Sequence, residues 1–193
     1  MKRLDEILFF WFGEPRNEPE YYDERRKLWF ASDPQIDQDI RNQFLADYER
    51  AAAHELQDWI ATPRSALALI LLYDQFPRNM FRGTPRAFAT DVLAREVTAH
   101  LLHTQGDQQL LTVERSFVYM PLMHSEDLSD QQRSVALFRQ LAQDEPLLNS
   151  VSYADRHLKI IEQFGRFPHR NAILGRSSTP EEIAFLQQPG SSF

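Results

Sequence analysis

The strongest constraint on the fold is a stripe of apolar residues that recurs every four positions over residues 36–60. Its members are Ile36, Ile40, Phe44, Tyr48, Ala52, Leu56 and Ile60. A four-residue spacing places side chains on one face of an α-helix. Charged residues such as Asp37, Arg41 and Glu49 occupy other positions. The pattern therefore predicts one long amphipathic helix of about seven turns.

Similar helical signals occupy the rest of the chain, and no segment shows the period-two alternation that is typical of strands. Further helices are predicted over residues 4–12, 20–30, 64–76 and 110–120, and after the capping or proline signals at residues 84–85, 129–132, 146 and 179–180. The helix over residues 64–76 is apolar on every side, so it should be central and buried. Pro77 and Pro121 are expected to end the helices before them. We predict an all-α protein of roughly eight or nine helices, packed as consecutive antiparallel hairpins in one domain over residues 1–193.

Composition excludes several classes of function. The net charge of −7 argues against non-specific nucleic-acid binding, which needs a basic surface. The chain has no cysteine, which excludes disulfides, thiolate metal sites and a cysteine nucleophile. It has no apolar run of about eighteen residues, no signal peptide and no glycine-rich phosphate loop. We expect a cytoplasmic protein that binds neither nucleic acid nor a membrane, and the sequence predicts no cofactor.

Two segments far apart in the sequence resemble each other. Residues 73–83, the first corner, and residues 162–176, the second corner, share several features. Each contains an acidic residue, Gln-Phe, Phe-Pro, Arg-Asn and a glycine beside an arginine. Each follows an apolar helical run, so each is predicted to form a turn after a buried helix. The near-duplication suggests two related halves.

The two corners carry the candidate ligand-binding residues. If the corners face each other, their guanidinium groups converge on one cleft, which would favour a phosphate or a carboxylate. Asp74 lies in the last turn of its helix, where the helix dipole disfavours an acid, so it should have a cationic partner such as Arg78. Alternatively, each corner only ends a helix, and Arg and Asn satisfy its last carbonyl groups. The candidates are Asp74, Arg78, Asn79, Arg82, His157, Arg166, His169, Arg170 and Asn171.

A candidate catalytic pair lies between the corners. His124 and Glu126 are two residues apart and could act as an acid–base pair, with Glu126 orienting His124. Alternatively, Glu126 pairs with an arginine and His124 bonds a backbone carbonyl. His100 and His103 have a spacing seen in metal sites, but no third ligand is identifiable, so no metal site is predicted.

The sequence leaves three hypotheses open. The first is a binding protein that holds a small anionic ligand, or the carboxylate of a peptide, in the Arg-lined cleft. The second is a hydrolase or lyase that uses His124 and Glu126, with arginines stabilising charge. The third is a buried Arg–carboxylate network that only locks the two halves together. We favour the first because the Arg-Asn pair occurs twice.

Three motifs together resemble a known family. They are Asp74 to Asn79 with Phe81-Arg82-Gly83, Tyr119-Met120-Pro121 with His124-Ser125-Glu126, and Phe164 to Asn171 with Leu174-Gly175-Arg176 and residues 178–182. In combination they are similar to the domain of unknown function 924 family, and the similarity extends over essentially the whole chain. The resemblance implies a tetratricopeptide-like all-α fold, in agreement with the helical pattern, and it implies no activity.

Overall fold

Every regular element in the described part of the chain is a helix. The computed structural model describes residues 2–16, 19–23, 25–144 and 150–192. The α-helices are α1 (Arg3–Phe12), α2 (Arg25–Phe30), α3 (Pro34–Ala52), α4 (Pro63–Ile70), α5 (Phe76–Met80), α6 (Asp91–Thr104), α7 (Thr112–Met123), α8 (Leu128–Asp144), α9 (Ser150–Phe164) and α10 (Pro180–Leu186). A π-helix, Leu71–Gln75, joins α4 to α5 without a break. Over the described ranges this gives nine continuous helical rods, so the prediction of an all-α protein is confirmed.

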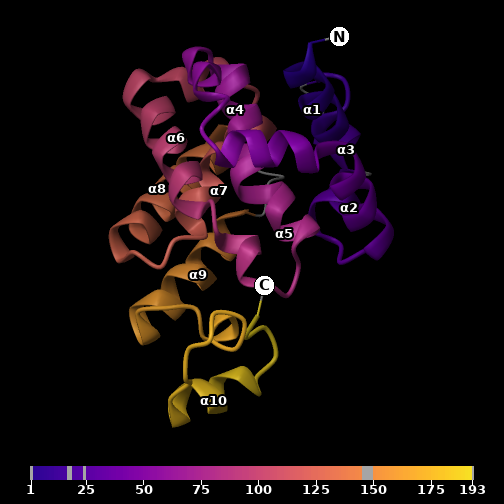
Figure 1. The fold of residues 1–193 in the computed structure, drawn as a ribbon. Coiled ribbons are helices and arrows are strands. Elements are labelled where there is room, and N and C mark those ends of the chain that lie inside the picture. Colours follow the sequence, from indigo (N-terminus) through magenta and orange to yellow (C-terminus); the bar gives the residue numbers. More distant parts are fainter. Residues whose placement is uncertain (1, 17–18, 24, 145–149, 193) are drawn as a thin grey trace.

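The rod formed by α4, the π-helix and α5 runs through the centre of the molecule. Every residue from 65 to 77 is buried, which confirms the predicted central helix. α3 packs against α5, while α7, α8 and α9 pack in succession (Figure 1). The main core is rich in aromatic rings: the ring centroid of Phe76 lies 4.9 Å from that of Phe44 and 5.5 Å from that of Trp11.

A second, smaller apolar cluster lies at the C-terminal end. It joins Ile160 and Ile161 of α9 to Phe167, with Phe164 and Phe185 packed against them. α9 leads from the main body to this region, and α10 lies beyond it (Figure 1). The start predicted at Pro146 for this helix lies outside the described residues.

The long helix predicted over residues 36–60 ends earlier than expected. α3 stops at Ala52, and His54 adopts a left-handed conformation with φ of 62°. The amide of His54 donates to the carbonyl of Ala51, and the amide of Glu55 donates to that of Arg50. This is the bonding pattern of a Schellman motif, which ends a helix. The last members of the apolar stripe lie beyond α3. Leu56 is buried in the core, and a short 3-10 helix, Gln57–Ala61, follows it.

The prediction that Pro77 and Pro121 end helices is wrong, since both lie inside helical segments. Pro77 has no amide hydrogen for the carbonyl of Tyr73, four residues earlier. The buried hydroxyl of Thr90 donates to that carbonyl instead, at 2.6 Å. In α7, the hydroxyl of Thr98 donates to the carbonyl of Val118, beside the gap that Pro121 leaves. At Pro77 the vacated carbonyl therefore receives a donor from outside its own helix, whereas at Pro121 the outside donor binds the neighbouring carbonyl.

The second corner has a different local structure from the first. α9 ends at Phe164, and Gly165 follows with φ of 67°, a conformation that glycine adopts without strain. The chain then turns through a 3-10 helix, Pro168–Arg170. The two corners share residues but not backbone conformation. Among the described helices, none is long and apolar enough to cross a membrane.

Candidate functional site

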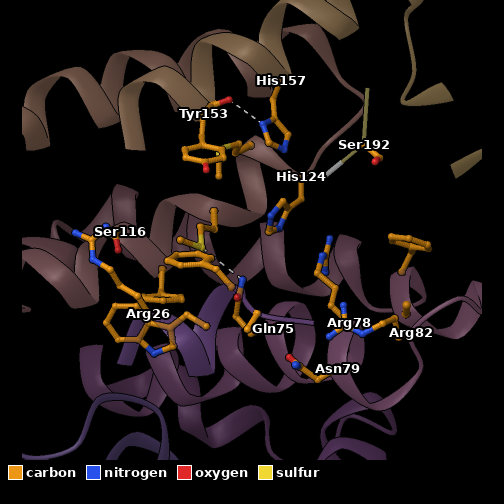
Figure 2. Close-up of a pocket in the computed structure, with 18 of the residues that line it drawn as sticks. Arg26, Gln75, Arg78, Asn79, Arg82, Ser116, His124, Tyr153, His157 and Ser192 are labelled. Carbon is orange, nitrogen blue, oxygen red and sulfur yellow. Dashed lines mark hydrogen bonds between the residues drawn. The ribbon is translucent and has the colours of Figure 1, made fainter. Parts of the chain in front are cut away.

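A cavity of about 850 Å³ lies where the two corners approach each other (Figure 2). It is lined by residues from α2, the π-helix, α5, α7, α9 and the 3-10 helix of the second corner. Seven sequence-predicted residues line it: Arg78, Asn79, Arg82, His124, His157, His169 and Arg170. The expectation that the corners face one cleft is therefore met by the geometry.

Asp91 joins the two corners. Both of its oxygens accept hydrogen bonds from Arg78, each at 3.1 Å. The Nη1 atom of Arg170 lies 3.9 Å from Asp91 Oδ2. The ring of Phe88 lies under both guanidinium groups, 5.7 Å from that of Arg78 and 4.8 Å from that of Arg170. One carboxylate and one ring thus hold two cations that are remote in the sequence.

Asp74 lies beneath the cavity and is fully buried. Its Oδ1 atom lies 3.1 Å from Arg78 Nη1 and 2.8 Å from His124 Nδ1, and its Oδ2 accepts from Gln75. Burial alone would raise the pKa of Asp74, but Arg78 and His124 outweigh it and hold that pKa below its usual range. Asp74 is therefore ionised, and the expected pairing with Arg78 is confirmed.

The bond to Asp74 fixes the tautomer of His124. An ionised carboxylate only accepts hydrogen bonds, so Nδ1 carries the hydrogen and Nε2 keeps its lone pair. Burial lowers the pKa of His124, assisted by the charges of Arg78 and Arg170 and opposed by Asp74. His124 is therefore neutral at pH 7. A neutral imidazole held in this way can accept a hydrogen bond or a proton at Nε2.

Arg170 is a buried cation with few partners. Its exposed fraction is 6%, and its guanidinium group stacks 4.4 Å from the ring of Phe167. Nη1 donates to the carbonyl of His124 at 3.0 Å, while Nε has no acceptor among the described residues. Burial, together with the charge of Arg78, lowers the pKa of Arg170 to about 10. The cation is retained at pH 7, but it is poorly compensated.

The other two histidines of the cavity are neutral as well. His157 Nδ1 donates to the carbonyl of Tyr153 at 2.8 Å. Burial lowers the pKa of His157 to about 3 and that of His169 to about 4. The positive charge of the cavity therefore comes from its arginines. Over the described ranges, no three His, Asp or Glu side chains are placed to hold a metal ion.

Comparison with known proteins identifies the family. The family model described as "Bacterial protein of unknown function (DUF924)" matches residues 7–190. The chain belongs to this family. It is also similar to a solved structure described as a protein of unknown function, ATU0120, from Agrobacterium tumefaciens. The two are 38% identical over 95% of this chain and 96% of that one, with a TM-score of 0.81. No curated protein matches the chain.

The family match covers every candidate residue, from Asp74 to Asn171, and the resemblance seen in the sequence is confirmed. Neither the description of the family nor that of the solved relative gives an activity. The chemistry of the site must therefore be argued from its own residues.

His124 and Glu126 do not pair with each other, and the alternative, in which Glu126 pairs with an arginine, is the arrangement observed. Glu126 accepts two hydrogen bonds from Arg176, at 2.7 and 2.9 Å, and one from the amide of Phe167 at 2.8 Å. α7 ends at Met123 with His124 as its C-cap, and the chain turns there, so the two side chains reach different neighbours. Asp74 takes the orienting position that was expected for Glu126.

Two further candidates lie outside the cavity lining. Arg166 and Asn171 both bind Glu182, and Arg166 does so through two hydrogen bonds of 2.7 and 2.8 Å. They tie the second corner to α10. Asn79 and Arg82 do line the cavity, but both donate to Asp37 of α3. These four residues are engaged within the protein.

Sequence reasoning missed Asp91 and Phe88, which hold the two corners together. Asp91 stands in the first turn of α6, where an acid is favoured by the helix dipole, so it carries no distinctive signal. It also missed the apolar part of the cavity, which includes Trp29, Phe117 and Met120. In the sequence those residues look like ordinary core residues of helices, and only the packing of the helices shows that they line a cavity.

Proposed function

We propose that this protein binds a small organic anion in the cavity between the two corners, with the anionic group at Arg170. The observation that carries the proposal is the state of Arg170. A cation that is 6% exposed normally has a close carboxylate, because burial without a partner is costly. The nearest carboxylate of Arg170, Asp91, lies 3.9 Å away and is already bound by Arg78 through two hydrogen bonds.

Two further features support an anion at this place. Nε of Arg170 has no acceptor among the described residues, so the hydrogen-bonding capacity of the guanidinium group is not used up within the protein. The cavity volume of about 850 Å³ also falls within the range of about 300–1,000 Å³ of small-molecule sites.

The test is a thermal-shift screen of carboxylates and phosphates at constant ionic strength, with sodium chloride as reference. A ligand at a hundred times its Kd adds about 2.7 kcal/mol to the free energy of unfolding. We expect stabilisation by one class of anion, lost in Arg170→Gln. The matched control is Arg139→Gln, because Arg139 is 63% exposed and forms a surface pair with Asp155. An equal shift in Arg170→Gln, or no shift with any anion, would contradict the proposal.

A second candidate function, a hydrolase or lyase, is favoured by the bond between Asp74 and His124. A carboxylate that holds Nδ1–H of a histidine leaves Nε2 as a general base, as in hydrolytic triads. Here Asp74 and not Glu126 would orient the base. A screen of ester and amide substrates tests this: His124→Gln should abolish any turnover but retain anion binding at Arg170. Turnover that persists in His124→Gln would remove the residue from the mechanism.

A further inference from the structure

One face of α7 forms a long wall of the cavity. Its lining residues are Thr112, Val113, Ser116, Phe117, Met120 and Met123, followed by the C-cap residue His124. They recur at intervals of three and four, so they share one face of the helix. With a rise of 1.5 Å per residue, this wall is about 16 Å long. Thr112 and Ser116 are polar, whereas Val113, Phe117, Met120 and Met123 are apolar, and these four side chains are buried with exposed fractions of 1–6%.

Other helices extend the apolar wall. From α2, Trp29 lines the cavity with its ring centroid 5.0 Å from that of Phe117, and Phe30 follows it with 63% of its surface exposed. Tyr153 of α9 also lines the cavity and is 51% exposed. Large apolar side chains exposed together mark ligand or partner sites. Methionines of α7 add flexible, polarisable surface that adapts to a bound chain.

The cations at the two ends of the cavity differ in how deeply they are buried. Figure 2 shows His124, Arg78 and Arg82 toward one end, and Arg26 and Ser116 toward the other. Arg26 has an ion pair with Asp23, at 3.1 Å, and its side chain is 46% exposed. The under-compensated buried cation, Arg170, contacts the backbone of His124 and so belongs to the first end. The cavity therefore combines one anion-binding end with an extended apolar wall.

We propose that the ligand is a fatty acid, a monocarboxylate with an unbranched aliphatic chain, whose carboxylate binds Arg170 and whose chain lies along α7. This inference rests on the proposed function. A small inorganic anion would leave the exposed rings of Phe30 and Tyr153 in water, and a neutral chain would leave Arg170 without its partner. Both parts of the cavity are used only by a ligand that has both properties.

The charges favour a carboxylate over a phosphate. At the polar end, the two cations Arg78 and Arg170 face the two anions Asp74 and Asp91. A dianion would bring two negative charges toward two carboxylates, whereas a monoanion brings one.

The experiment is isothermal titration calorimetry of the full chain at pH 7 with butyrate, hexanoate, octanoate and decanoate, below micelle formation. Decan-1-ol represents the aliphatic chain without a negative charge, and inorganic phosphate represents a negative charge without the chain. Each added methylene should lower Kd about fourfold, the factor that corresponds to 0.8 kcal/mol. We expect decanoate to bind most tightly, and decan-1-ol and phosphate at least tenfold more weakly.

Two substitutions at exposed phenylalanines distinguish a loss of binding to the aliphatic chain of the ligand from a loss of folding. Phe30→Ser removes apolar surface at the cavity rim and should weaken decanoate binding while leaving butyrate unchanged. Phe9→Ser is the matched control, because Phe9 is 46% exposed and does not line the cavity.

Arg170→Gln tests the anionic end of the site. It should weaken the binding of every acid in the series and leave the binding of decan-1-ol unchanged.

The outcomes separate the two proposals. If all the carboxylates bind through Arg170 with the same affinity, the fatty-acid inference is wrong and anion binding stands. If phosphate binds more tightly than decanoate, the ligand class is wrong in the same way. If decan-1-ol binds as well as decanoate and Arg170→Gln changes nothing, anion binding itself is wrong. Failure of every probe to bind contradicts both.

Discussion

The neutral, buried state of His157 makes a quantitative prediction about acid stability. His157 is 4% exposed, and burial lowers its pKa to about 3, while positive charge on His124, Arg170 or His169 would add to the cost of protonation. In the unfolded chain a histidine takes up a proton near pH 6.5. Between about pH 6.5 and 3 the unfolded state therefore binds a proton that the folded state does not.

The sign of the effect follows from this difference. Because the unfolded state binds more protons in this window, the free energy of unfolding falls as the pH is lowered from about 6.5. One pH unit is worth about 1.4 kcal/mol per histidine, so the 1.5 units between 6.5 and 5 cost roughly 2 kcal/mol for His157 alone. The contribution is fully present above pH 6.5.

Urea denaturation at 25 °C, at pH 7 and at pH 5, measures this contribution. His157→Asn keeps an amide donor for the carbonyl of Tyr153 and removes the titration. We expect the loss of stability from pH 7 to pH 5 to be roughly 2 kcal/mol smaller in His157→Asn than in the unsubstituted protein. His54→Asn is the matched control, because His54 is exposed and its left-handed conformation suits asparagine. The same pH dependence in His157→Asn and in the unsubstituted protein would refute the reasoning.

Two further predictions concern stability. Asp74→Ala should lower the free energy of unfolding by roughly 3–5 kcal/mol, because it removes one partner of a buried pair. Arg82→Ala should cost at most about 1 kcal/mol, because the Arg82 side chain is 45% exposed in its ion pair with Asp37. Similar losses of stability in Asp74→Ala and Arg82→Ala would contradict the assignment of Asp74 to a buried ion pair. Thr90→Val should cost about 1–3 kcal/mol, since the carbonyl of Tyr73 loses its donor. Thr84→Val should cost at most about 1 kcal/mol, because Thr84 is an exposed residue, although its hydroxyl donates to the carbonyl of Phe81. Denaturation curves compare both pairs.

The helical fold was predictable because it rests on local periodicity. The stripe over residues 36–60 and the apolar run over residues 64–76 each mark a buried face, whatever their neighbours are. Helix ends were less predictable because they depend on distant donors. In the central rod, Pro77 has no amide hydrogen for the carbonyl of Tyr73, and the hydroxyl of Thr90, seventeen positions after Tyr73, donates to it instead. Nothing in the local sequence encodes that contact.

Most of the predicted residues line the cavity, and the pairing of Asp74 with Arg78 was predicted, but the partner of His124 was not. The repeated Arg-Asn signal pointed to Arg78 and Arg170, and both line the cavity. The partner of His124 was sought two positions away, at Glu126, although the contacting carboxylate is Asp74, fifty positions earlier in the chain. Proximity in sequence gives no contact where a helix ends and the chain turns. The pairing is a property of helix packing.

Comparison of the arginines also bears on whether the Arg–carboxylate network between the two corners is only structural. Arg166 donates two hydrogen bonds to Glu182, of 2.7 and 2.8 Å. Arg176 donates two to Glu126, of 2.7 and 2.9 Å. Where the fold needs an ion pair to hold segments together, it therefore supplies a dedicated carboxylate in a two-bond geometry. Arg170 is more buried than either and lacks such a partner, with its nearest carboxylate at 3.9 Å. A purely structural role leaves that difference unexplained, whereas an anion that enters the cavity accounts for it.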